Sequence, residues 1–581
     1  MKKNLLVLSS LILIGTLASC AASTPATPSS SLPTTSSAPL SVERKSAVEY
    51  IGGPTAKSTI DLCFLNGVKD IPFLEMADVA TELLKIGPLL SSSYTLTPAY
   101  QDGVYTLTWE NGASVVFDFN QKTLTYNAFD YFFATSAAET GIDVVGLTGF
   151  NSKNEPSLIE REKTDSSYRS GPASITIALG EKGIPLYRDG AKAYLPLQTF
   201  SDFLISPNPI FYAYNGADVF IGTGSTDDNK YTDLYYTMTP SQRSEALAKF
   251  TYTEFAAMFD TFYGLKDVKH IDSFDTFVTN LGLKADLTSL EAKSADVALA
   301  KLAYSYLGDQ HTKYLSNSPY LGKDVTIKKE DYWSSECHDM YTRVDGLKAA
   351  RSAAYPAMPF FEIVGDTAFF QFDTFAIGAG ESYYTTEPSL SSTDSLGQML
   401  YAHKQILAAG SAVKKVVMDL SCNTGGQADM AALASAWFLG ESVIAVNNTC
   451  SGSEAMNAYR VDANLDHKFD ANDTLGDRKL YCLTSRASFS CGNLLPNLFK
   501  NSGKVSLIGQ KSGGGACVVA PLSLADGTIF RISGARRLDT VKNGTFYPID
   551  QGADPDYAIT DLSFLYQNKR ADLVNYIDSL H

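Results

Sequence analysis

The chain has 581 residues, 45% of them hydrophobic and 11% aromatic. That length is enough for about two to four domains, each with a real core. The formal net charge of −16 argues against nucleic acid or anionic lipid as an electrostatic partner, and we interpret the acidic balance as a means of solubility.

Residues 1–20 are typical of a secretory signal peptide, with a basic start and an apolar run from Leu5 to Leu17. The end of this segment, Leu17-Ala18-Ser19-Cys20, resembles a bacterial lipobox, whose cysteine is lipidated and becomes the mature N-terminus. A lipid attaches a protein to a membrane face without spanning it, and no later run approaches the ~20 apolar residues of a spanning helix. We expect an exported protein, lipid-anchored through Cys20 to the outer face of the cell membrane, or in the periplasm or outer membrane, and otherwise soluble.

Seven cysteines follow Cys20, an odd number without CxxC pairs, which favours neither a disulfide framework nor a zinc site. Most are expected to be small core residues. A pair among Cys482, Cys491 and Cys517 is left open.

The first half of the chain divides by composition. Residues 21–42 are rich in Ser, Thr, Pro and Ala and predict a flexible linker. Residues 43–238 predict an α+β, strand-rich region in which segments 58–86 and 174–205 look alike. Each runs from a strand through a turn and an Ile-Pro or Leu-Pro step into an amphipathic helix. We expect two similar N-terminal units, 43–165 and 166–238, for binding or for spacing.

The second half changes pattern twice. Residues 239–330 have apolar residues at three- and four-residue spacing and predict a helical segment. Within residues 331–581, strands near 360–375, 414–420, 442–448 and 479–485 alternate with helices near 396–410 and 429–440. That order predicts an α/β domain with a largely parallel sheet.

The stretch 479–515 contains Ser488 and Ser490 at a strand-to-helix turn. A helix N-terminus offers unpaired N–H groups and positive potential, and the oxyanion formed when a serine attacks needs such donors. The alternative is that either serine caps the helix.

Three further places complete a catalytic pattern. Strand 416–420 ends in a loop with Gly425 and Gly426, where the backbone can approach a ligand closely; it is an oxyanion donor or a structural turn. A serine hydrolase needs a base, and among the six histidines His311, on a glycine-containing loop after a helix, is the best placed. Asp554 lies in a late loop, either as the carboxylate that orients the imidazole or in an ordinary turn.

The motifs LGDQHT, DLSCNTGG, SFSCGN, GQKSGGGA and GADPD, in this order, resemble the C-terminal-processing (tail-specific) serine peptidase family over about 240–570. The chain looks most like the tricorn-core branch, which includes chlamydial protease-like activity factor. The resemblance implies a crotonase-like (ClpP-like) α/β core that cuts polypeptides through an acyl-enzyme. It implies the nucleophile Ser490, the base His311 and the carboxylate Asp554, with Cys491 N–H and the Gly425-Gly426 loop as oxyanion donors.

The sequence departs from the family pattern in three ways. Gly515 stands where serine–lysine relatives carry Lys, so a Ser-Lys dyad is not expected, although Lys511 is near in sequence. The carboxylate is commonly Glu in the relatives, which leaves Asp556 or Asp550 as substitutes for Asp554. No PDZ-like insert is recognisable.

An acidic segment has residues at positions 1, 3, 5, 9 and 12 of a calcium loop, but lacks its glycine and its final Glu. These residues are Asp462, Asn464, Asp466, Asp470 and Asp473. A solvated acidic loop is the favoured interpretation, and we predict neither a metal nor a cofactor.

The sequence therefore predicts a lipid-anchored serine endopeptidase that acts on proteins or peptides outside the cytoplasm. The alternative is a catalytically silent peptide- or glycan-binding lipoprotein of the same fold, and an esterase is a third option. Substrate, cleavage preference, oligomeric state and latency are left open.

Overall fold

The computed structural model describes residues 39–86, 95–134, 142–146, 158–223, 232–378, 380–388 and 390–580. The expected signal peptide, Cys20 and the expected linker up to residue 38 lie outside the described residues. No helix in the described ranges is long and apolar enough to cross a membrane. The seven cysteines after Cys20 are all described, and each is a free thiol.

The part of the chain with the glycine loop and Ser490 is built on a six-stranded sheet. Its strand order is β15-β16-β17-β20-β21-β25. β15 pairs antiparallel with β16, and the remaining neighbours are parallel, so the prediction of a largely parallel sheet is confirmed. The strands are β15 (Phe361–Val364), β16 (Thr367–Gln371), β17 (Lys415–Asp419), β20 (Lys479–Thr484), β21 (Val505–Gly509) and β25 (Tyr557–Ala558).

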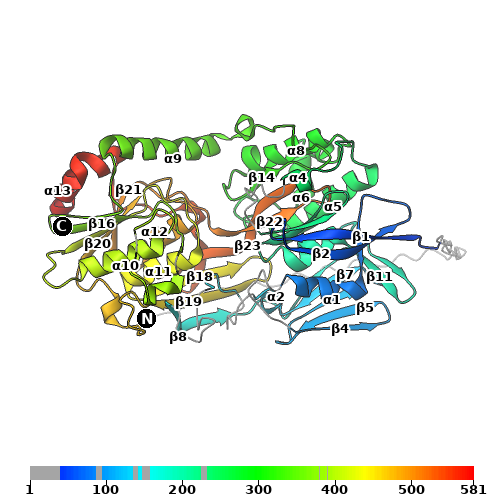
Figure 1. Ribbon diagram of the computed structural model, residues 1–581, viewed down its shortest axis with the longest axis horizontal. Helices are drawn as coiled ribbons and strands as arrows, with labels where there is room; N and C mark the ends of the chain where they lie inside the picture. The colour runs from blue at the N-terminus through cyan, green and yellow to red at the C-terminus, as the bar shows by residue number, and fades with distance from the viewer. Residues whose placement is uncertain are drawn as a thin grey trace, which may run out of the picture. The chain divides into compact units, whose positions relative to one another are not determined.

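Helices cover both faces of this sheet because its buried side chains alternate between them. Val416 and Met418 of β17 pack with α10 (Ser395–Ile406), α11 (Ala428–Leu439) and α12 (Cys491–Ser502). Val417, between them, packs on the opposite face with α9 (Ser335–Ala354), η9 (Leu562–Arg570) and α13 (Ala571–Ser579). Figure 1 shows α10, α11 and α12 grouped together, with α9 and α13 apart from them.

A second sheet, antiparallel throughout, connects this core to the His311 loop. Its order is β14-β23-β18-β19-β8, and β22 and β24 also pair with β23. β14 begins two residues after His311, and its Lys313 lies opposite Arg531 of β23. The strands are β8 (Ile159–Arg169), β14 (Lys313–Ser316), β18 (Ser442–Asn448), β19 (Ser453–Val461), β22 (Cys517–Ser523), β23 (Ile529–Lys542) and β24 (Thr545–Pro548).

The predicted helical segment contains α5 (Glu245–Phe262), α6 (Phe274–Asn280), α7 (Lys284–Leu287) and α8 (Ala292–Lys301). Ser244 caps α5 by accepting a hydrogen bond from the Leu247 N–H. α8 continues into a π-helical turn, η4 (Leu302–Leu307), which ends at Gly308 with a left-handed φ of 58°. This glycine stop turns the chain into the loop that carries His311.

Both look-alike N-terminal segments contribute strands to one seven-stranded sheet, of order β10-β11-β3-β2-β1-β13-β12. β3 of the first segment pairs antiparallel with β11 of the second, with Leu74 opposite Leu195. The expected boundary at residue 165 falls inside β8. A five-stranded sheet, β4-β5-β6-β7-β9, completes the region.

The remaining elements of the N-terminal region are short. The strands are β1 (Val42–Ile51), β2 (Lys57–Leu65), β3 (Phe73–Glu75), β4 (Leu96–Gln101), β5 (Val104–Trp109), β6 (Ser114–Asp118), β7 (Thr123–Asn127), β9 (Ser174–Ile177), β10 (Tyr187–Asp189), β11 (Lys192–Pro196), β12 (Ile210–Tyr214) and β13 (Val219–Thr223). The helices are α1 (Met76–Lys85), α2 (Phe129–Phe132), α3 (Leu197–Phe200), η2 (Ser201–Ile205) and α4 (Thr232–Tyr235).

Candidate active site

Ser490 lies at the turn between β20 and α12 in an unusual backbone conformation. Its φ of 58° and ψ of −127° are rare for a residue other than glycine, and such outliers cost about 1–3 kcal/mol. Ser490 is the N-cap residue of α12, yet its hydroxyl makes no capping hydrogen bond. Its N–H donates to the Gly514 carbonyl at 2.9 Å, which fixes the turn. The hydroxyl is thus held at a helix N-terminus without serving as a cap, which suits a nucleophile.

Ser488, the other serine of this turn, is fully buried and engaged in the fold. Its hydroxyl donates to the Leu420 carbonyl at 2.7 Å and accepts from the Ser485 N–H at 2.9 Å. These bonds join the turn to the end of β17. Ser488 is therefore a structural residue, and Ser490 remains the candidate nucleophile.

The Gly425-Gly426 loop lies directly against the Ser490 turn. A Cβ atom added at Gly425 would lie 2.7 Å from the Ser490 Cβ and 3.1 Å from the Cys491 nitrogen. One added at Gly426 would lie 2.2 Å from the Phe375 carbonyl oxygen. Both glycines also have a positive φ, 102° and 137°, so only glycine fits here. The loop and the start of α12 therefore form a single surface beside the nucleophile.

The side chain of Cys491 contacts the same loop. Burial raises the pKa of its thiol to about 12, while the Gly426 N–H and the Ser490 hydroxyl act in the opposite direction. The Gly426 N–H and the Ser490 hydroxyl therefore lie beside the thiol. At neutral pH the thiol is protonated, so Cys491 itself is not a reactive nucleophile.

Asn423 is a residue of the site that the sequence interpretation missed. It is fully buried, and its side-chain oxygen accepts from the Gly425 N–H at 2.8 Å while its amide donates to the Phe372 carbonyl at 2.8 Å. Its own carbonyl accepts from the Phe489 N–H at 3.0 Å. Asn423 thus holds the glycine loop and the nucleophile turn together. An amide-bearing residue two positions before a glycine pair was the available signal.

His311 is 5% exposed, and Arg531 Nε donates to its backbone carbonyl at 2.8 Å. Burial lowers the pKa of His311 to about 4, and the nearby Asp309 carboxylate acts against that shift. The imidazole is therefore neutral at pH 7, as a general base must be. Its Nδ1 is buried without a hydrogen-bond partner, and within the described residues no hydrogen bond joins the ring to Ser490.

Phe489 connects His311 to the glycine-rich turn before β22. Its ring centroid is 4.8 Å from that of His311, with the ring planes at 62°. A Cβ atom at Gly515 would lie 2.6 Å from the Phe489 ring, so a lysine does not fit there without rearrangement. Lys511, the nearby alternative, is paired with Asp554 at 3.7 Å. That this site has no Ser-Lys dyad stays a prediction.

The structure distinguishes the candidate carboxylates. The Asp554 side chain is 76% exposed and paired with Lys511, so it does not lie against the buried His311. Asp556 pairs with Lys500 and accepts from the Leu507 N–H at 2.9 Å, which fixes it to β21.

Asp550, the third candidate carboxylate, binds the glycine-rich turn before β22. It accepts from the N–H groups of Gly515 and Ala516 at 3.3 and 3.2 Å. Burial raises its pKa, and the negative charge of Asp309 adds to that effect. Asp550 is thus partly desolvated and next to the turn on which Phe489 packs.

The acidic segment 462–473 is satisfied by its own backbone. Asp462 accepts from the His467 N–H at 2.8 Å, and Asp473 accepts from the Ala463 N–H at 2.8 Å. Asp470 and Asp473 form a capping box around a short 3₁₀ turn. Among the residues that the structure describes, no group of three His, Cys, Asp or Glu side chains is arranged to hold a metal ion.

Comparisons with known proteins bear on the second half of the chain. Residues 384–559 match the model of peptidase family S41; this range includes the glycine loop, Ser490 and the candidate carboxylates but not His311. No curated protein matches the chain.

Several solved structures are similar to parts of the chain at low identity. A putative peptidase from Parabacteroides merdae is 16% identical with a TM-score of 0.40, over 57% of this chain and 96% of that one. A lipoprotein from Streptococcus agalactiae is 13% identical with a TM-score of 0.33, over 59% of this chain and 98% of that one. Mature CPAF is 10% identical with a TM-score of 0.38, over 57% of this chain and 96% of that one.

The family match agrees with the motif-based resemblance, and it covers the part of the chain in which Ser490 and the glycine loop meet. Residues 384–559 thus carry the sequence pattern of an S41 peptidase domain, which supports a peptidase.

Proposed function

We propose that this protein is a serine endopeptidase with a crotonase-like core that hydrolyses proteins or peptides outside the cytoplasm. The observation that carries the proposal is Ser490, a strained residue at a helix N-terminus whose hydroxyl is not used as a cap and whose Cβ lies close to a two-glycine loop. Strain of this kind persists where the surrounding structure requires it, often at active sites. The S41 match of residues 384–559 supports the reaction class.

In the proposed reaction His311 accepts the hydroxyl proton as Ser490 attacks a peptide carbonyl. The N–H of Cys491 and the Gly425-Gly426 loop stabilise the oxyanion, and His311 then gives the proton to the leaving amine. Water hydrolyses the acyl-enzyme with His311 again as the base. Catalytic hydrogen bonds are often long in an unliganded enzyme and tighten in the substrate complex. The chemistry of these residues requires no cofactor.

We propose Asp550, rather than Asp554, as the carboxylate that orients His311 in the substrate complex. Asp550 is partly buried next to the Gly515 turn, and the unpartnered Nδ1 of His311 requires an acceptor. Asp554 is committed to Lys511 at the surface. Asp550→Asn is therefore expected to lower kcat strongly, and Asp554→Asn to leave it within about twofold.

The proposed location follows from residues 1–20. Export by the signal peptide and lipidation of Cys20 would hold the enzyme at the outer face of a membrane, or in the periplasm. Linker residues 21–42 would separate the enzyme from the lipid surface.

The test uses a chain that begins at residue 42, incubated with unfolded casein and a peptide library. We expect cleavage, also in the presence of a chelator, and a loss of at least about a thousandfold in kcat for Ser490→Ala and His311→Ala, with thermal stability kept in the first. A fluorophosphonate should label the wild type but not Ser490→Ala. Cleavage that survives in Ser490→Ala would rule out the nucleophile.

The rival function is a catalytically silent peptide- or glycan-binding lipoprotein. It is favoured by the absence of a Ser490–His311 hydrogen bond in the described residues. Peptide or glycan binding without cleavage or fluorophosphonate labelling, unchanged in Ser490→Ala, would support it. Ester turnover without cleavage of unfolded protein would indicate an esterase.

A further inference from the structure

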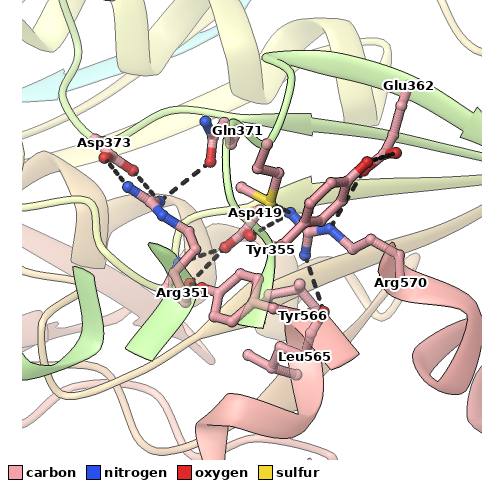
Figure 2. Close-up of polar contacts among 12 residues, drawn as sticks. Arg351, Tyr355, Glu362, Gln371, Asp373, Asp419, Leu565, Tyr566 and Arg570 are labelled. Carbon is pink, nitrogen blue, oxygen red and sulfur yellow. Dashed lines mark hydrogen bonds and ion pairs between the residues drawn. The ribbon is translucent and has the colours of Figure 1, made fainter. Parts of the chain in front are cut away.

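Two arginines from outside the central sheet reach acidic residues at the carboxyl ends of β16 and β17 (Figure 2). Arg351, near the end of α9, binds Asp373, and Arg570, at the end of η9, binds Asp419 at 2.7 Å. In Figure 2 the two guanidinium groups lie on opposite sides of the Asp419 carboxylate, so the two ion pairs are neighbours.

The Arg570–Asp419 pair is part of the buried core. Both side chains are almost fully buried, and Asp419 also accepts from the Ser421 N–H and hydroxyl at 3.0 and 2.6 Å. Arg570 lies 5.0 Å from the ring centroids of Phe369 and Tyr566. Removing one partner of such a buried pair is strongly destabilising, so this pair stabilises the fold.

The Arg351–Asp373 pair is different because it is partly open to solvent and belongs to the segment whose backbone contacts the glycine loop. Arg351 binds Asp373 through both terminal nitrogens, at 2.7 and 2.5 Å, and donates to the Gln371 side chain at 3.1 Å. The side chain of Arg351 is 13% exposed and that of Asp373 is 34% exposed. A bidentate arginine–carboxylate pair fixes orientation as well as distance.

The segment that starts at Asp373 is the support on which the glycine loop rests. The Asp373 carbonyl accepts from the Thr424 N–H at 3.3 Å, and the Thr374 hydroxyl donates to the Gly425 carbonyl at 3.0 Å. The Phe375 N–H also donates to the Gly425 carbonyl, at 2.8 Å. Gly426 has no room for a Cβ atom against Phe375. A displacement of segment 373–375 must therefore be transmitted to the loop.

We infer that Arg351 is a positioning residue that holds segment 373–375, and through it the Gly425-Gly426 loop, at the correct distance from Ser490. This inference rests on the proposed function. A donor aimed at an oxyanion stabilises the transition state only at hydrogen-bonding distance, and a shift of about 1 Å costs up to about a hundredfold in rate. Arg351 does not touch the reacting atoms, so its effect passes through the loop.

The test compares Arg351→Gln with Lys348→Gln, an exposed residue of the same helix that loses the same charge. We expect Arg351→Gln to lower kcat about 10- to 100-fold with KM within about twofold, because the ground state does not need the oxyanion donors. Arg351→Lys keeps the charge but not the two-pronged guanidinium, so its kcat should lie between those of the wild type and Arg351→Gln. Lys348→Gln should be within about twofold of the wild type in both parameters.

Two readouts separate loop positioning from general damage. The affinity for a peptide aldehyde, which forms a tetrahedral adduct, should fall in parallel with kcat/KM, whereas the affinity for the matching peptide acid should not. Amide hydrogen exchange in residues 423–427 should accelerate in Arg351→Gln but not in Lys348→Gln. If Arg351→Gln does not fold, Asp373→Asn removes the same pair from its other side and should give the same pattern.

Unchanged kcat with unchanged exchange in the loop, in a wild type that cleaves, would overturn this inference alone. A rise in KM at constant kcat would also overturn it. If the wild type does not cleave, but hydrogen exchange in the loop is faster in Arg351→Gln than in the wild type, the proposed function would be overturned while Arg351 would be shown to hold the loop.

Discussion

His311 is the residue whose protonation should be visible in the stability of the whole protein. Burial lowers its pKa from 6.5 to about 4, and the same side chain in the unfolded chain titrates near 6.5. Between these two values the unfolded state binds more protons, so stability falls as the pH falls. The contribution is complete above about pH 6.5 and is lost as the pH approaches 4.

Relative to His311→Gln, the wild type should therefore lose about 2 kcal/mol of unfolding free energy between pH 7 and pH 5. Urea unfolding at the two pH values measures this difference. His338→Gln is the matched control because its side chain is exposed on α9. An equal pH dependence of wild type and His311→Gln would mean that the native imidazole is not held neutral by burial.

At the scale of the elements, the turn between β21 and β22 packs tightly against the Phe489 ring. Gly515 has a φ of 86°, and the Phe489 ring occupies the space where a side chain at this position would lie. Gly410 offers a control, since its φ of 79° is similar but nothing lies within 4 Å of an added Cβ. Comparing alanine substitutions at the two glycines therefore distinguishes the cost of backbone strain, which both share, from the cost of the clash, which only Gly515 has.

We expect Gly515→Ala to destabilise the protein by about 2 kcal/mol more than Gly410→Ala, because it adds a clash to the same backbone strain. It should also lower kcat, since displacing Phe489 moves the His311 ring that packs on it. Thermal unfolding and steady-state kinetics of the two variants measure these effects. Equal destabilisation would show that the Phe489 ring moves aside without cost.

At the scale of the whole molecule, a buried carboxylate pair links the N-terminal region to the helical segment. Asp202 of η2 and Glu254 of α5 are fully buried, and Thr199 donates to Glu254 at 3.0 Å. Burial raises the pKa of both groups, and the two negative charges oppose each other. The side chains of both regions also belong to one hydrophobic core, which includes Phe200 and Phe255.

Because the folded-state pKa of Glu254 lies above its unfolded value, the folded state keeps a proton that the unfolded chain has lost at neutral pH. Stability from this group is present below about pH 4.5 and falls as the pH rises through the raised pKa. Glu254→Gln should therefore gain about 3.5 kcal/mol over the wild type between pH 5 and pH 8, because burial raises the folded-state pKa of Glu254 to about 8. Glu245→Gln, at an exposed position of the same helix, should show no such gain in thermal or urea unfolding. A constant difference between Glu254→Gln and the wild type would contradict a protonated Glu254.

The sequence by itself determined the features that are local in the chain. Hydrophobic periodicity predicted the helical segment and the parallel sheet, and motif order brought Ser490, His311 and the glycine pair into one hypothesis. The structure adds that Ser490 and Gly425 are in contact. The helices and strands could be predicted because each depends on residues that are near one another in sequence, whereas Ser490, His311 and the glycine pair were grouped through the order of the motifs that carry the family resemblance.

Only the tertiary structure decided what depends on burial and on partners far away in the chain. Ser488 is bound to Leu420 and Asp554 to Lys511, while Asp550 lies beside Gly515. The pairing of β3 with β11 joins two segments that look like separate units in sequence. A side chain's role depends on desolvation and hydrogen-bond geometry, and both are set by contacts that its sequence neighbours do not encode.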